Sequence, residues 1–167
     1  MATATYDLIA SQTLGSAAAS ITFSSIAASW TDLRIVLVGQ HATSSVNLFM
    51  RYNSDTATNY SVTYLYGDGS SATSATSTSQ TYLLMTAGGN LTSTVPELFT
   101  VDIFSYNGST YKTCLMTSSE DRNGTGYVER FVGLWRSTSA ITSVTFALSS
   151  GNFAIGTTAN LYGIKAA

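Results

Sequence analysis

Alternation of apolar and polar residues at every second position is the feature that most constrains the fold of this chain. It is clearest in the stretch from Tyr127 to Ser149. There, Val144, Phe146 and Leu148 alternate with small residues. A period of two places these three side chains on one face of a pleated strand. The stretch therefore predicts β structure with one buried face.

The first half of the same stretch is apolar on both faces. Phe131 and Trp135 share one face of the expected strand, and Val132 and Leu134 share the other. Such a pattern is typical of an interior strand that is covered on two sides. The polar segment Arg136–Ala140 has the length of a hairpin connection, so we expect the two halves to form a hairpin in the core.

Similar runs recur along the chain, and no helical period persists beyond two turns. The other runs expected as strands are Tyr6–Ala10, Ile21–Phe23, Leu33–Val38, Val46–Tyr52, Tyr60–Tyr66, Tyr82–Thr86, Leu98–Tyr106, Tyr111–Ser118 and Ala159–Ile164. About ten short strands separated by turn signals predict an all-β fold, an antiparallel β-sandwich that is jelly-roll-like. Asn107-Gly108 is a strong tight-turn dipeptide and predicts a hairpin around it.

The length of 167 residues is that of one domain. We therefore expect residues 1–167 to form a single β-sandwich domain, with residues 1–20 as an extended arm plus the first strand. Residues 67–79, GDGSSATSATSTS, are low in complexity and show no periodicity, which predicts an exposed loop.

The composition excludes several classes of protein. The hydrophobic fraction of 44% argues against disorder, and the charged fraction is only 10%. The net charge is -2 and the basic residues are scattered, so no nucleic acid partner is expected. The N-terminal segment lacks the basic start and apolar core of a signal peptide, and no apolar run is long enough to span a membrane. We expect synthesis in a cytosol and no membrane partner.

Residues for catalysis are scarce. His41 is the only histidine and Cys114 the only cysteine, so an ordinary zinc site cannot be built. A Ser-His-Asp triad would have to use His41, which we interpret as a strand-end residue, and Cys114 as a small buried hydrophobe. Glu120-Asp121 and the nearby Glu129 do not mark the paired carboxylates of a glycosidase. The sequence predicts no enzyme, no cofactor and no resident metal.

Two alternatives remain open at this point. Loops of β-sandwiches can bind calcium, and Asp55 with Asn53 and Asn59, or Asp68 alone, could contribute oxygen ligands. Trp30 and Trp135 could stack on sugars, although a tryptophan in a strand is more commonly buried.

The expected strand Tyr60–Tyr66 carries a line of aromatic residues. Tyr60, Tyr64 and Tyr66 share one face, followed directly by the polar loop that contains Asp68 and Ser70. A row of tyrosines forms either a core face or a contact platform. We take these five residues as the candidates for an interface with another subunit.

Several segments together resemble a known family. These are TLGSAAASITFSSI followed by WTDLRIVL, RYNSDTATNYS, YLYGDGSSA, GLWRSTSAITSVTF and SGNFAIGTTANLYGI. In this order, from Thr13 to Ile164, they resemble a family of tailed-bacteriophage virion proteins, which includes small capsid cement (decoration) proteins and parts of tails or fibres. The resemblance implies a β-sandwich and a trimer, and it offers no catalytic residues.

The resemblance also implies a location and a partner. The chain is short and lacks the repeats of a fibre shaft, which favours a compact role on the capsid surface. We therefore expect a structural protein of the virion, made in the host cytoplasm, that binds the major capsid protein as a symmetric homotrimer and clamps neighbouring subunits. The alternative is a tail or fibre component that binds a host receptor or glycan.

Overall fold

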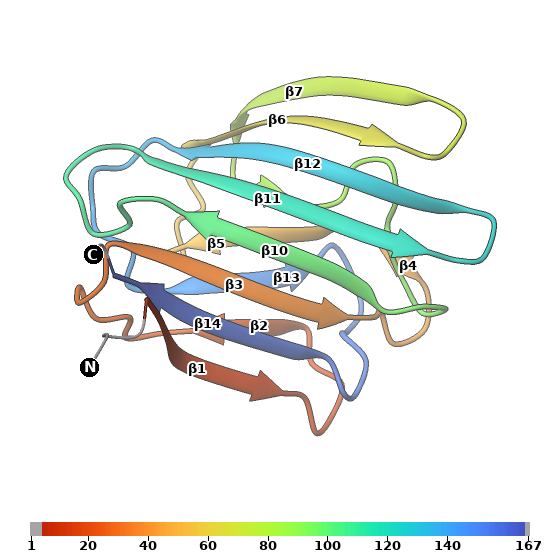
Figure 1. The fold of residues 1–167 in the computed structure, drawn as a ribbon, viewed down its shortest axis with the longest axis horizontal. Coiled ribbons are helices and arrows are strands. Elements are labelled where there is room, and N and C mark those ends of the chain that lie inside the picture. The colour runs from red at the N-terminus through yellow and green to blue at the C-terminus, as the bar shows by residue number, and fades with distance from the viewer. Residues whose placement is uncertain (1–4, 166–167) are drawn as a thin grey trace.

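The computed structural model describes residues 5–165, which form two packed antiparallel sheets (Figure 1). The strands are β1 (Tyr6–Thr13), β2 (Ser20–Phe23), β3 (Asp32–Gly39), β4 (Ser45–Val46), β5 (Leu48–Tyr52), β6 (Tyr60–Gly67), β7 (Ala72–Gln80), β8 (Leu83–Leu84), β9 (Leu91–Thr92), β10 (Glu97–Ile103), β11 (Lys112–Asp121), β12 (Gly126–Trp135), β13 (Val144–Leu148) and β14 (Thr158–Ile164). The large sheet has the order β1-β14-β3-β10-β11-β12-β6-β7. The small sheet has the order β2-β13-β5-β8, and β4 pairs with β9.

The strand order is that of a jelly roll with two added hairpins. Strands β1, β14, β3 and β10 lie side by side in one sheet, and β2, β13, β5 and β8 in the other, which is the double-sheet order of eight strands in two Greek keys. The hairpin β11–β12 is inserted between β10 and β13, and β6–β7 between β5 and β8. Both hairpins extend the large sheet, so β6 and β7 lie at its far edge in Figure 1.

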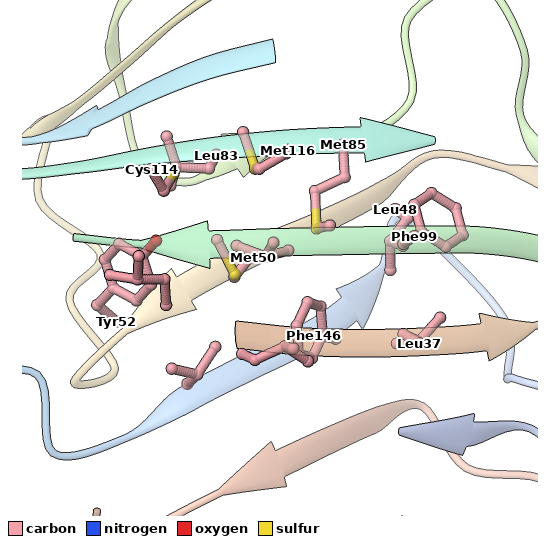
Figure 2. Close-up of a cluster of buried hydrophobic side chains, with 14 of the residues drawn as sticks. Leu37, Leu48, Met50, Tyr52, Leu83, Met85, Phe99, Cys114, Met116 and Phe146 are labelled. Carbon is pink, nitrogen blue, oxygen red and sulfur yellow. The ribbon is translucent and has the colours of Figure 1, made fainter. Parts of the chain in front are cut away.

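The core lies between the sheets and consists of the side chains that point inward at every second position. Its main members are Leu33, Ile35 and Leu37 of β3, Phe99, Val101 and Ile103 of β10, Leu48, Met50 and Tyr52 of β5, and Val144, Phe146 and Leu148 of β13. Figure 2 shows methionines filling the space between the rigid rings and leucines, which suits their flexible side chains. Trp135 is only 2% exposed, so its predicted place in the same core as β13 is confirmed.

The predicted hairpin within Tyr127–Ser149 is wrong. β12 lies in the large sheet between β11 and β6, whereas β13 lies in the small sheet between β2 and β5. Residues 136–143 cross from one sheet to the other, and Asn53 holds them by accepting the Thr142 N–H at 2.8 Å. The outer face of β12 is also uncovered, since Val132 is 47% exposed. Alternation identifies the faces of a strand, but not the sheet to which the strand belongs.

The predicted loop at residues 67–79 is also wrong for most of its length. Its second half is β7, which pairs with β6 from Ala72 onward. Asp68 closes the turn before it by accepting the N–H groups of Ser70 and Ser71 at 2.8 and 2.7 Å. The sequence shows no apolar alternation here because β7 is exposed or half-exposed throughout and buries neither face.

Other local predictions agree with the structure. Gly108 donates its N–H to the Ser105 carbonyl at 3.0 Å, and the turn at Asn107-Gly108 joins β10 to β11 as expected. The predicted first strand is β1, although residues 1–4 of the expected arm lie outside the described residues. The strand count is 14 instead of about ten, because β7 and the two-residue strand β9 were not expected and the run Val46–Tyr52 is divided between β4 and β5.

Candidate binding surface

A groove of about 590 Å³ lies on the outer face of the large sheet. Its floor is one row of residues across four neighbouring strands, in which Val38 lies beside Leu98, Leu98 beside Ser119, and Ser119 beside Val128. The three apolar members are 38%, 41% and 71% exposed. Because Ser119 has a small side chain, the floor of the groove is deeper between Leu98 and Val128. The floor is thus an apolar surface open to solvent.

Two turns and a proline form the walls of the groove. The turn between β6 and β7 contributes Gly67 to Gly69, and the turn between β11 and β12 contributes residues 124–126, with Pro96 before β10. In the second turn the φ angles of Asn123 and Gly124 are 60° and 117°. The left-handed region at 117° is one that only glycine adopts without strain, so Gly124 fixes the shape of this wall.

The rim of the groove is acidic. Asp68 and Asp121 both line it, and each carboxylate accepts N–H groups of its own turn. Backbone hydrogen bonds from Ser70 and Ser71 lower the pKa of Asp68 to about 2, so it stays ionised at physiological pH. Glu120 also lies beside the groove but forms an ion pair with Arg122. The surface combines an apolar floor with fixed negative charge at its edge.

Three glutamates lie together on the inner side of the same end of the sheet. Glu97 is 1% exposed, Glu120 8% and Glu129 1%. Burial, together with the neighbouring Glu120 and Glu129 carboxylates, raises the pKa of Glu97 to about 8. One oxygen each of Glu97 and Glu120 makes no hydrogen bond with the described protein.

Glu129 is the structural member of this cluster. Its Oε1 accepts N–H groups from Ala87, Gly88 and Gly89 at 3.0, 2.5 and 3.1 Å, and Ser118 donates to its Oε2 at 2.5 Å. The carboxylate therefore ties the segment between β8 and β9 to the large sheet. A carboxylate with all these donors is occupied in holding the fold and is not free for a substrate.

The structure separates the five sequence-predicted interface residues. Tyr60 is 0% exposed, and its hydroxyl donates to the Tyr52 carbonyl at 3.2 Å, so it belongs to the core and is no surface residue. Tyr64 and Tyr66 are half-buried and stacked, with ring centroids 6.5 Å apart. Asp68 lies on the groove rim, and the exposed Ser70 donates to it.

The other residues considered for chemistry have structural partners. His41 is buried, its Nδ1 accepts the N–H groups of Thr43 and Ser44 at 3.1 and 2.8 Å, and it closes the turn after β3. Burial raises the pKa of the Cys114 thiol to about 11, which keeps it protonated and unreactive. Asp55 Oδ2 accepts from Trp135 Nε1 at 2.7 Å and from Asn59, so this oxygen already has protein donors in place of calcium.

Sequence reasoning missed the groove floor. The floor residues come from separate parts of the chain, namely Val38, Leu98 and Val128. Each lies in a stretch that the sequence predicts as a strand with one or both faces buried. The available signal was the outward position of Val128 and Val132 in a strand whose inward face is already supplied by Phe131 and Trp135.

Neither the described residues nor comparisons with known proteins assign a metal site, a membrane-spanning helix or a family. Within residues 5–165, no group of three or more His, Cys, Asp or Glu side chains is placed to hold a metal ion. The same part of the chain contains no helix that is long and apolar enough to cross a membrane. Scans against family models, curated proteins and solved structures found no match.

Proposed function

We propose that this protein is a structural component of a tailed-phage particle, a cement protein that binds the assembled capsid and clamps neighbouring subunits of the major capsid protein. The resemblance of its ordered segments to virion proteins suggests the setting. The single observation that carries the proposal is the open apolar groove on the outer face of the large sheet, at Val38, Leu98 and Val128. Apolar side chains gathered in an open hollow are a common feature of protein interaction sites.

The chemistry of the groove specifies the partner surface. An apolar side chain would fill the floor, and a basic residue beside it would meet Asp68 and Asp121 at the rim. Complementary charge at a rim sets specificity and orientation more than affinity. The partner surface is therefore an apolar anchor flanked by Lys or Arg, exposed on the capsid protein.

Many copies would make a weak contact effective. Only 10% of the residues of this chain are charged, so repulsion between crowded copies is small. A symmetric oligomer, a trimer in the form that the resemblance implies, engages several capsid subunits at once and gains from avidity. A protein that binds the assembled shell but not the free subunits stabilises that shell by mass action.

The second candidate is glycan or receptor binding at a tail. The feature that favours it is Tyr127, a half-buried aromatic residue that lines the groove together with Asp121. Aromatic faces beside carboxylates suit sugar rings and their hydroxyls. In this case soluble oligosaccharides would bind in the groove, and intact capsids would not.

The test is binding of the purified protein to particles that lack it, measured by co-sedimentation. Val128→Asp places a charge on the groove floor at a position that is 71% exposed, so the fold should tolerate it. We expect capsid binding to weaken about 10- to 100-fold, the usual range for an anchor residue in an interface.

The matched control is Tyr111→Asp. Tyr111 is 56% exposed and lies just before β11, at the end of that strand away from the groove. This variant should bind like the wild type. Equal binding of both variants, or binding of the wild type to glycans but not to particles, would remove the cement proposal.

A further inference from the structure

Strand β7 is an open edge of the large sheet. It has nine residues, ATSATSTSQ, with no charge and no proline. It hydrogen-bonds β6 on one side, and no described strand pairs with its other side, where it forms the upper edge in Figure 1. Free N–H and C=O groups along such an edge are a template for pairing with another chain.

The other sheet edges in residues 5–165 are shortened or protected. Edge strand β1 contains a bulge between Leu8 and Ala10, and its Asp7 forms an ion pair with Lys165 at 2.9 Å. In the small sheet, the edge strands β2 and β8 have only four and two residues. Bulges, charges and short edge strands are the usual means of preventing pairing between sheets. β7 has none of them along its first six paired positions, since its one irregularity lies near Gln80.

We propose that β7 pairs antiparallel with β7 of a second copy of this chain, about a two-fold axis near Ala75. In that arrangement Ser74 faces Thr76 of the second copy, and Thr73 faces Ser77. All the opposed side chains are small or carry a hydroxyl, and none is charged. The strand is therefore complementary to itself, as a two-fold interface requires.

The chain already uses this kind of side-chain pair between its own strands. Such hydroxyl pairs are Thr22 with Thr145 at 3.0 Å, Thr63 with Thr76 at 3.2 Å, and Thr100 with Thr117 at 2.5 Å. Cross-strand hydroxyl pairs add to the stability of antiparallel ladders. Pairing of β7 with its copy would continue the pattern across the interface and join two eight-stranded sheets into one.

This contact is independent of the particle role proposed above. A two-fold contact at β7 joins two single chains, or two trimers if a threefold contact exists elsewhere on the molecule. In either case the isolated protein has a mass that is an even multiple of 17.6 kDa. Particle binding through the groove can fail without changing this mass, so failures of the two proposals are distinguishable.

The experiment is analytical ultracentrifugation of the full chain and three double variants. Ser74→Lys/Thr76→Lys puts like charges opposite each other and should weaken the association at least about tenfold. Ser74→Lys/Thr76→Glu places each introduced lysine opposite an introduced glutamate across the two-fold axis. This variant should keep a mass that is an even multiple of the chain mass. Ser109→Lys/Thr113→Lys adds the same charge at exposed positions near the other end of the sheet and should also keep it.

Each outcome has a defined meaning. Pairing through β7 is supported if the wild type contains an even number of chains, the Lys/Lys variant loses this association, and the Lys/Glu variant and the control keep it. A wild type that sediments as a monomer or a trimer overturns it. An even mass that persists in the Lys/Lys variant, or is lost in the Lys/Glu variant, also overturns it. Circular dichroism of each variant verifies that the fold is intact.

Discussion

Trp135 joins several parts of the core at one end of the sandwich. Its ring stacks on Tyr60 at a centroid distance of 6.3 Å and an interplanar angle of 17°. It also contacts Tyr52, at 5.6 Å. Its Nε1 donates to Asp55 Oδ2, so its polar group is satisfied although the side chain is buried. The indole therefore connects both sheets to the loop after β5.

Replacing this indole tests its structural role. We expect Trp135→Ala to lower the free energy of unfolding by about 3–5 kcal/mol, because it removes a large buried aromatic and leaves a cavity. Trp135→Phe keeps most of the ring contact but removes the donor to Asp55, and should cost less. Urea denaturation followed by circular dichroism measures both. A loss below about 1 kcal/mol for Trp135→Ala would place the indole at the surface and favour sugar stacking.

At the scale of residues, sequence reasoning succeeded where periodicity and size decide burial. Trp135 and Phe146 were placed in the core because each lies on the apolar face of its strand. It failed for Tyr60, which is fully buried, whereas Tyr64 and Tyr66 on the same face of the strand are only half-buried. The small sheet covers only the first part of β6, and the extent of that cover depends on contacts distant in the chain.

At the scale of elements, the glutamates of β10, β11 and β12 predict an unusual pH dependence. Glu97 faces Glu120 of β11 and Glu129 of β12, with Arg122 also nearby. The pKa of Glu97 rises from an ordinary value of 4.5 to about 8. The native state therefore retains a proton that the unfolded state releases, and stability falls as pH rises from about 4.5 to 8.

The measurement is urea denaturation at pH 5 and pH 8.5. The wild type should lose stability on the order of a few kcal/mol between these values, seen as a lower midpoint at unchanged slope. Glu97→Gln is neutral at both values, so most of the difference should disappear. The aspartates with lowered pKa values, Asp7, Asp55 and Asp68, lose their contribution only as pH falls toward and below about 4, outside this window. Equal wild-type midpoints at the two pH values would contradict the account of this cluster.

The elements that sequence reasoning found are those with one buried face. β3, β10 and β13 were each expected close to their true bounds. β7 was missed because neither of its faces is buried, so its sequence carries no alternation. The connection between β12 and β13 was misread because a polar segment of similar length can turn back within one sheet or cross to the other. That choice depends on the packing of the whole sandwich.

At the scale of the molecule, the two inserted hairpins give the jelly roll its asymmetry. They extend one sheet to eight strands while the facing sheet keeps four. The wide sheet leaves a broad outer face, the groove formed by strand ends and turns, and the open edge at β7. An all-β sandwich could be predicted from the alternation in sequence. The groove could not, because its floor combines residues from β3, β10, β11 and β12 that only the sheet order brings into one row.

The most direct test of the cement proposal is the copy number of this chain in intact, purified particles. Quantitative mass spectrometry against the major capsid protein measures it. A cement protein that covers the shell should be present in hundreds of copies, in a fixed ratio to the capsid protein. A handful of copies per particle would contradict the capsid role and favour the tail, and the absence of the chain from particles would contradict any role in the virion.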